Sequence, residues 1–277
     1  VLVAIFVVLG AYFQGHHVVK TVGTGIVAAN TLNTTTVLVA LLVSGFFVTI
    51  ATFAGVPVST SQAVVGGIVG VGLALDIDIC YTKVYHIVQS WVISPFLTAL
   101  LAWLFYWLIL KILPKFEKKL ANSILSWSVI LSACYVAFSL GANNAGNAVG
   151  PISNIGFASI KVLTFAVGLF MAIGALTFSK NVTETVGKDI TPLDLPGALA
   201  AQFSSAFGLH FFSMMGIPVS TSQAVVGAVF GVGLLKGIGS VSRKKMGVIV
   251  IGWVVTPTFA AICSYFTIFV LKILGVL

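Results

Sequence analysis

Long apolar runs alternate along this chain with short polar or glycine-rich stretches. The runs cover about residues 1–14, 34–54, 84–112, 124–140, 159–178, 195–215 and 246–275. About 20 apolar residues in a helix cross the hydrocarbon core of a bilayer. The pattern therefore predicts an all-α integral membrane protein with several membrane-crossing helices.

Three glycine-rich stretches, at 57–75, 141–151 and 218–235, are too short or too interrupted to be ordinary spans. At membrane depth, non-helical backbone is tolerated only where it is buried in protein or lines a water-filled cavity. We therefore expect discontinuous helices or re-entrant hairpins near the bilayer midplane at these places.

Two of these stretches contain the same ten residues, because Pro57 to Gly66 recur letter for letter as Pro218 to Gly227. A proline and a hydroxyl at a helix start could serve only as first-turn residue and cap. Capping explains one Ser or Thr in each copy, but not three hydroxyls and a carboxamide in both. A duplicated break in apolar segments is the usual pointer to a transporter's substrate site, and we expect such a site to use the cap geometry as well.

Further matching positions indicate that the chain contains one internal duplication. Gly10-Ala11 recur as Gly174-Ala175, and the pair Trp91 and Pro95 recurs as Trp253 and Pro257. The order is kept and the spacing drifts by only a few residues. We therefore divide the chain into a first repeat at 1–112, a basic cytoplasmic linker at 113–122 and a second repeat at 123–277.

The first repeat is expected to be incomplete at its N-terminal end. Residues from about 124 to 164, which include the asparagine-rich segment 141–148, have no counterpart in it. We expect a segment upstream of Val1 to carry a first copy of this asparagine motif. Without that copy, we expect an unfilled groove beside Pro57–Gln62, or another chain segment that occupies it.

Charges are rare and unevenly placed. Hydrophobic residues make up 59% of the 277 positions and charged residues 7%, whereas soluble domains carry about 25% charge. The net charge of +8 is not a nucleic-acid signature, because the basic residues flank apolar runs and only Arg243 is an arginine. The loop at 236–245 is basic, whereas its repeat counterpart at 76–83 has two Asp and one Lys. Basic loops stay cytoplasmic, so the pattern predicts two halves of opposite orientation.

The polar residues expected at membrane depth are neutral and rich in oxygen. Hydroxyls and free N–H groups at helix starts suit a tetrahedral oxyanion, helped by the positive end of the helix dipole. Carbonyl oxygens suit a hard cation such as Na⁺. No Arg lies in these segments, so bound cations would have to neutralise a buried anion.

The segment Gly141-x-Asn143-x-x-x-Asn147-Ala148, together with the duplicated Pro-x-Ser-Thr-Ser-Gln blocks, resembles the inorganic phosphate transporter (PiT) family. The resemblance covers essentially the whole chain. It implies a secondary active transporter at the plasma membrane that imports phosphate by alternating access, driven by Na⁺ in preference to H⁺. It also implies a homodimer and no further cofactor. A sulfate permease of the same family is the alternative, and an anion channel would need a continuous polar pore.

The resemblance carries site roles onto this chain. The phosphate-binding residues it implies are Ser59, Thr60, Ser61, Gln62, Asn144, Ser220, Thr221, Ser222 and Gln223. The sodium-binding residues it implies are Ser59, Gln62, Asn143, Asn144, Asn147, Ser220 and Gln223. Asn144 departs from the family pattern, which often has Asp at this position, so one negative charge is missing here.

Other polar residues point less clearly to function. His16 and His17 are interpreted as loop residues, His210 as a packed interhelical donor, and Glu184 as a solvated charge at a helix end. The three cysteines are interpreted as small core residues: Cys80, Cys134 and Cys263. The chain has no P-loop and no nucleophile–base pair, so we expect no enzyme. The aromatic residues of 91–108 could form a dimer contact or face lipid equally well.

Overall fold

The computed structural model describes residues 1–28, 31–153, 155–178, 192–237 and 243–277. These residues form helices and connecting turns, with one isolated bridge between Val27 and Ile79. The helices are α1 Leu2–Gln14, α2 His16–Lys20, η1 Thr21–Gly25, α3 Thr34–Phe53, α4 Thr60–Ala74, α5 Tyr81–Ile112, η2 Leu113–Lys115, α6 Lys118–Ser153, α7 Ile160–Thr177, α9 Leu195–Met214, α10 Thr221–Lys236 and α11 Arg243–Ile273.

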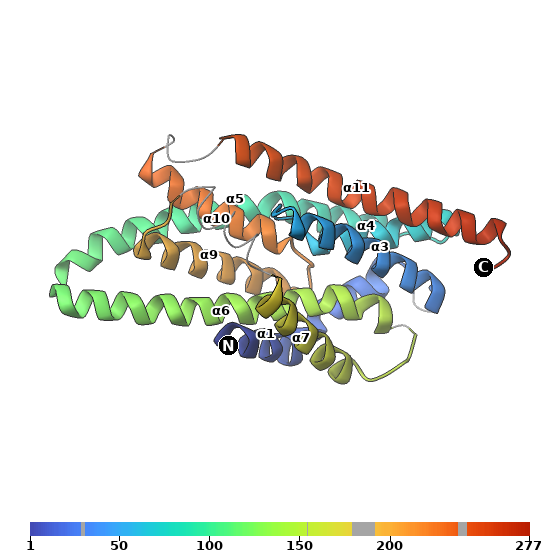
Figure 1. The fold of residues 1–277 in the computed structure, drawn as a ribbon, viewed down its shortest axis with the longest axis horizontal. Coiled ribbons are helices and arrows are strands. Elements are labelled where there is room, and N and C mark those ends of the chain that lie inside the picture. The colour runs from blue at the N-terminus through green and yellow to red at the C-terminus, as the bar shows by residue number, and fades with distance from the viewer. Residues whose placement is uncertain (29–30, 154, 179–191, 238–242) are drawn as a thin grey trace.

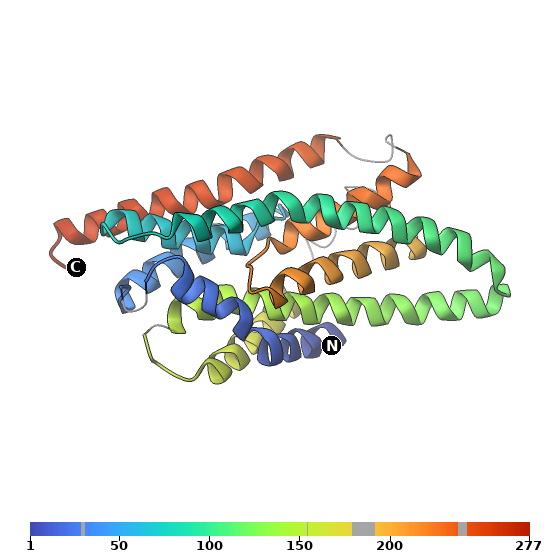
Figure 2. The ribbon, with the colours of Figure 1, turned by 180° about the vertical axis from the view of Figure 1, so that it is seen from behind.

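Three long helices, α5, α6 and α11, run along the length of the molecule (Figure 1). The shorter helices α4 and α10 pack on α11 and α5 respectively, and α9 packs on both α5 and α6. On the other side of α6, α1 packs against α6 and α7, as the view from behind makes clear (Figure 2). The helices α4, α9 and α10 therefore lie among the long helices, whereas α1 and α7 lie on the outer side of α6.

Five of the described helices, α3, α5, α6, α7 and α11, are long and apolar enough to cross a membrane. A sixth span is possible if α1 and the following 16–25 segment, which meet at a 52° bend, are counted together. The helices α4 and α10 are apolar but shorter. The chain is thus an all-helical, multi-pass membrane protein, and the prediction of short helices at 57–75 and 218–235 is confirmed.

The two short helices are each preceded by the same kind of turn. α3 ends at a glycine with positive φ, Gly55, and α9 ends at Gly216 with nearly the same φ, 71° and 72°. In both turns the glycine and the next residue donate backbone hydrogen bonds to the last turn of the helix. This is the Schellman arrangement, which favours Gly because a side chain is strained at positive φ. An extended Pro-containing segment then leads into α4 or α10.

The two short helices also make matching backbone contacts with long helices. A Cβ added to Gly66 would lie 2.3 Å from the carbonyl oxygen of Pro257, and one added to Gly227 would lie 2.3 Å from that of Pro95. One turn further on, Gly70 and Gly231 touch α11 and α5 just as closely. Small residues that let helix backbones approach are typical of membrane helix interfaces. These glycines therefore serve as points of close helix contact.

The prediction of a separate half-helix or hairpin at 141–151 is wrong, because these residues belong to the continuous helix α6. Its glycines are contact points instead of breaks. Gly141 lies against the backbone of Val7, and Gly146 against Val18. Tight packing on α1 and α2 stabilises the helix despite the low intrinsic propensity of Gly and Asn. Pro151 stands near the C-terminal end of α6, and residues 118–122 of the predicted linker form its first turns.

Candidate functional site

The N-termini of α4 and α10 meet in the core of the molecule, where the polar part of α6 contacts both. The Ser61 hydroxyl, in the first turn of α4, donates a 2.7 Å hydrogen bond to the carbonyl oxygen of Val219, which immediately precedes α10's cap. The two copies of the duplicated block are therefore within hydrogen-bonding distance of each other, although 158 positions separate these residues.

Side chains from α6 complete this contact, and we call Ser61, Asn143, Asn144, Asn147 and the Val219 backbone the asparagine cluster. Asn143 binds both backbone groups of Val219: its Nδ2 donates to the carbonyl oxygen at 2.9 Å, and its Oδ1 accepts from the amide at 3.2 Å. Asn147 Nδ2 donates to Ser61 Oγ at 2.7 Å. The single helix α6 thus binds both the first turn of α4 and the residue just before the cap of α10.

Asn144 occupies the more open side of the cluster. Its Oδ1 accepts long hydrogen bonds of 3.4 Å from the side-chain amides of Asn143 and Asn147. Asn143 and Asn147 are fully buried, whereas Asn144 is partly exposed. Of the three asparagines, Asn144 is therefore the one that a solute could reach.

Ser59 and Ser220 are the N-caps of α4 and α10. Each hydroxyl accepts a 3.2 Å hydrogen bond from the amide of the residue three positions later, Gln62 or Gln223. The two amides between each cap and its glutamine, at 60–61 and 221–222, have no acceptor within their own helix, because first-turn N–H groups never do. Two helix starts with available donors and positive dipole ends thus lie close together, and this arrangement suits an anion.

The hydroxyls beside these amides are the accessible ones. Thr60 and Thr221 are partly exposed, and neither side chain forms a hydrogen bond with another described residue. Ser222 is also partly exposed, and its Oγ contacts only Ser220 Oγ, at 3.2 Å. Ser61, by contrast, is fully buried and already bonded in the cluster. Of the predicted phosphate ligands, Thr60, Thr221, Ser222 and Asn144 are therefore the most available.

Three buried carboxamide oxygens next to these groups have no hydrogen-bond donor in the described part of the chain: Gln62 Oε1, Asn147 Oδ1 and Gln223 Oε1. Nearly all buried polar atoms in proteins are satisfied, and one that is not costs about 1–3 kcal/mol. All three belong to residues predicted to bind sodium. Carbonyl-type oxygens without a donor are the ligands that a coupling cation requires in transporters with broken helices, so the residues present fit such a cation.

Gln62 and Gln223 also line a cavity of about 1290 Å³ between α4, α5, α10 and α11. Matching positions of both sequence repeats form its walls, among them Gly66 with Gly227 and Trp91 with Trp253. Most of the other lining residues are apolar. The expectation of an unfilled groove beside Pro57–Gln62, or of another chain segment filling it, stays a prediction.

Trp91 also contacts the site, although the sequence indicated only that its position recurs in both repeats. It is buried, and its indole Nε1 donates a 3.1 Å hydrogen bond to the Pro218 carbonyl oxygen. Pro218 precedes Val219, so this bond fixes the segment that the asparagine cluster binds. The only sequence signal was the recurrence of Trp91 and Pro95 in both repeats.

Comparison with known proteins assigns the chain to a family. Residues 1–264 match the "Phosphate transporter family". The chain belongs to this family. The match confirms the resemblance drawn from the asparagine motif and the duplicated blocks, and it identifies the protein as a transporter.

The relatives of this chain are named for different solutes. The transporter is 31% identical to the "Putative phosphate permease" of Methanocaldococcus jannaschii, over 96% of this chain and 82% of that protein. It is also 31% identical to the sulfate permease CysP of Bacillus subtilis, over 96% of this chain and 75% of CysP. Its structure is similar to a solved one entitled "The sodium-dependent phosphate transporter", with a TM-score of 0.86 and 25% identity over 98% of this chain and 89% of that one.

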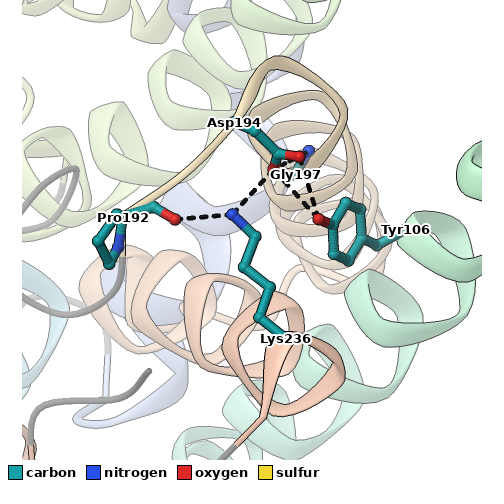
Figure 3. Close-up of polar contacts among 5 residues, drawn as sticks. All are labelled: Tyr106, Pro192, Asp194, Gly197 and Lys236. Atoms are coloured by element: carbon teal, nitrogen blue, oxygen red, sulfur yellow. Dashed lines mark hydrogen bonds and ion pairs between the residues drawn. The ribbon is translucent and has the colours of Figure 1, made fainter. Parts of the chain in front are cut away.

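A charged cluster in the transporter joins the N-terminal end of α9 to the C-terminal end of α10 (Figure 3), and it therefore lies at the other end of α10 from the site. Asp194, the N-cap of α9, lies 2.9 Å from Lys236 Nζ and accepts a 3.1 Å hydrogen bond from the Tyr106 hydroxyl. Burial by itself raises the pKa of the Asp194 carboxyl, but the hydrogen bonds from Lys236 and Tyr106 outweigh burial and hold that pKa below its ordinary value. The equivalent positions of the other repeat, Asn33 and Leu75, are uncharged.

The predictions for the histidines of the transporter are partly confirmed and partly wrong. His210 Nδ1 lies 2.9 Å from the Tyr135 hydroxyl, so the packed interhelical contact is confirmed. His16 and His17 are not loop residues: they begin α2, because the chain bends at Gly15 and continues as a helix. No group of three or more potential metal ligands among His, Cys, Asp and Glu occurs in the described part of the chain. Glu184 lies outside the described residues.

The cysteine prediction holds only for Cys134, which is buried. Cys80 is exposed because it occupies the N-cap position of α5, and Cys263 is partly exposed. All three are free thiols.

Two aromatic residues of 91–108 have neither of the predicted roles, contact with a second copy or with lipid, because Trp91 and Tyr106 are buried within the chain. Phe96, by contrast, is exposed.

Proposed function

We propose that this chain imports inorganic phosphate across the plasma membrane as a secondary active transporter, driven by a Na⁺ gradient. The observation that carries the proposal is the meeting of two helix N-termini at the asparagine cluster, next to three unsatisfied carboxamide oxygens. The first group of atoms suits an oxyanion and the second a cation. A buried anion and cation stabilise each other, which couples their binding.

The proposed phosphate ligands are the first-turn amides and hydroxyls of α4 and α10, from the blocks Ser59–Gln62 and Ser220–Gln223, together with Asn144. The proposed sodium ligands are oxygen atoms of Asn143, Asn144, Asn147, Gln62, Gln223 and the two capping serines. Because Ser59 and Ser220 already cap their helices, each would contribute only its remaining lone pair. The unsatisfied oxygens are the stronger candidates.

We further propose that the repeats 1–112 and 123–277 are inverted relative to each other and that the site alternates between the two sides of the membrane. Matching contacts support this relation: α4 packs on α11 as α10 packs on α5, through glycines at equivalent positions. The loops of opposite charge in the two repeats support opposite orientations, with basic loops in the cytoplasm.

Binding measured by calorimetry on the purified transporter tests the coupling of ion and anion. We expect phosphate to bind more tightly in Na⁺ than in K⁺ at equal ionic strength, because Na⁺ would occupy the unsatisfied oxygens. Equal phosphate affinity in both salts would contradict sodium coupling. Sulfate is the second candidate substrate, because the relative CysP is named a sulfate permease, and tighter binding of sulfate than of phosphate would favour it.

A homodimer is the proposed assembly. The helices α5 and α11 are lightly buried within one chain and carry large exposed apolar side chains, with Phe96 73% exposed and Val254 67% exposed. Such a surface contacts either lipid or a second copy. Cross-linking in native membranes distinguishes the two: a dimer band supports the proposal, and a monomer band alone contradicts it.

A further inference from the structure

The two Pro-containing segments before α4 and α10 have identical sequences but are held differently. Trp91 Nε1 donates to the Pro218 carbonyl oxygen at 3.1 Å. Trp253, its counterpart in the other repeat, has a buried Nε1 that finds no hydrogen-bond partner among the described residues. One indole of the pair is therefore satisfied by the opposite repeat, and the other is not.

A serine pair shows the same difference between the repeats. Ser61 Oγ donates to the Val219 carbonyl oxygen at 2.7 Å, whereas the equivalent Ser222 Oγ hydrogen-bonds only Ser220 Oγ among the described residues. A second pair differs within each repeat. Ser44 Oγ lies 2.6 Å from the Ala40 carbonyl oxygen of its own helix and also 2.9 Å from the Ala63 carbonyl oxygen of α4, whereas its equivalent Ser205 donates to Gln202 in its own helix.

The missing contacts do not arise because the second set of partners lies far apart. A Cβ added to Gly252, next to Trp253, would lie 3.8 Å from Val58 Cγ1 and 3.9 Å from Val56 Cγ1. The backbone contacts of Gly66 and Gly227 are equally close in the two repeats. The acceptor equivalent to Pro218, the Pro57 carbonyl, thus lies between two residues whose side chains approach the backbone next to Trp253.

We propose that Trp91 and Trp253 are paired positioning residues that hold the segment of the opposite repeat in alternate states of the transporter. In the present structure Trp91 holds Pro218 and Val219 in place. In the other state Trp253 donates to the Pro57 carbonyl oxygen and Ser222 to that of Val58, while the Trp91 and Ser61 bonds are released. The inference rests on the alternating access proposed above.

The two states should have similar energies, because each forms one indole hydrogen bond and lacks the other. A buried indole N–H without an acceptor costs about 1–3 kcal/mol, and each state leaves one of the two indoles in this condition. Neither state is then strongly favoured, and a ligand with modest differential affinity could shift the population. Removing one indole N–H should therefore favour the state in which that indole was unsatisfied.

Cysteine modification in membrane vesicles tests this exchange. A parent with Cys80, Cys134 and Cys263 replaced by Ala receives Val219→Cys as a reporter, because Val219 is fully buried in the present state. The rate of modification by N-ethylmaleimide then reports how often the Val219 segment is released. Trp91→Phe should raise this rate by about fivefold or more, and Trp253→Phe should lower it by a similar factor, because about 1–3 kcal/mol corresponds to roughly 5- to 150-fold in a population.

Controls separate this exchange from general loosening. Trp103 lies on the same helix, about three turns from Trp91, so Trp103→Phe should leave the modification rate unchanged. Trp91→Phe combined with Trp253→Phe should return the rate towards that of the parent. If both single variants raise the rate, or neither changes it, the proposal is wrong. Phosphate uptake by the same parent is measured separately, so that loss of the proposed substrate and loss of the exchange are distinguished.

Discussion

Asn147 donates a 2.7 Å hydrogen bond to Ser61, which lies 86 positions earlier in the chain. Ser61 in turn donates to the backbone of the other copy of the duplicated block. This chain of bonds connects the motif helix α6 to the first turns of both α4 and α10. It explains physically why a neutral Asn motif and two Ser-Thr-Ser-Gln blocks occur in one sequence.

Ser61→Ala tests the strength of this connection. The substitution leaves Asn147 Nδ2 without its short acceptor and removes a donor from Val219, so the melting temperature should fall and phosphate uptake should decrease strongly. A lost buried partner costs about 1–3 kcal/mol. Ser204→Ala is a matched control, because Ser204 Oγ is buried without any partner, and it should be neutral or slightly stabilising. Equal melting temperatures for the two variants would contradict the connection.

Thr60→Ala and Thr221→Ala remove accessible hydroxyls at the two helix starts. Because hydrogen bonds to charged groups contribute about 1.5–3 kcal/mol, each variant should lose about tenfold or more in phosphate affinity while its melting temperature without phosphate stays unchanged. Thr49→Ala on α3 is the control, since its hydroxyl bonds only the carbonyl of Gly45 in its own helix. Wild-type affinity in both variants would exclude these hydroxyls as ligands.

Gln62→Met tests the unsatisfied carboxamide oxygen. Met has a similar volume but no buried acceptor, so in sodium-free buffer the variant should melt at the same temperature as the wild type or higher. Sodium should raise the melting temperature of the wild type, because a ligand of the folded state stabilises it, and should do so less in the variant. The same stabilisation by sodium in both proteins would show that Gln62 is not a ligand.

The sequence predicted the helices and the residues of the cluster better than it predicted their connections. Apolar runs and the duplicated blocks located α4 and α10, because those features are local. The sequence did not predict the continuity of α6, because glycines at 141 and 146 usually interrupt a helix. Here they are contact points on which α1 and α2 pack, and such long-range packing has no local sequence signal. The bond from Trp91 joins residues 127 positions apart, and no local pattern indicates such a partner.

Asp194→Asn tests the charged cluster and its dependence on pH. Asn is also a good N-cap, so the variant removes mainly the ion pair with Lys236. Because the pKa of Asp194 is lowered in the folded state, the contribution is fully present above the unfolded pKa of 3.8 and is lost as the pH falls through the lower folded value. The variant should melt below the wild type at pH 7, and the difference should shrink as the pH falls below about 4.

The control for this cluster is Asp78→Asn, which removes an exposed carboxylate from a loop of the other repeat. It should change the melting temperature little at either pH, because isolated surface charges contribute little. The Asp194 difference should also decrease at high salt, since Asp194 is 46% exposed. A loss of stability that is the same at pH 7 and pH 3 would point to the cap and not to the charge.

Uptake of labelled phosphate into proteoliposomes that contain only the purified transporter tests the central claim most directly. With an inward Na⁺ gradient, we expect saturable phosphate uptake that exceeds uptake with an equal K⁺ gradient and that excess sulfate competes only weakly. Asn147→Ala should abolish the sodium-dependent part. Phosphate uptake that is the same with Na⁺, K⁺ or no gradient, or transport of sulfate in preference to phosphate, would contradict the account.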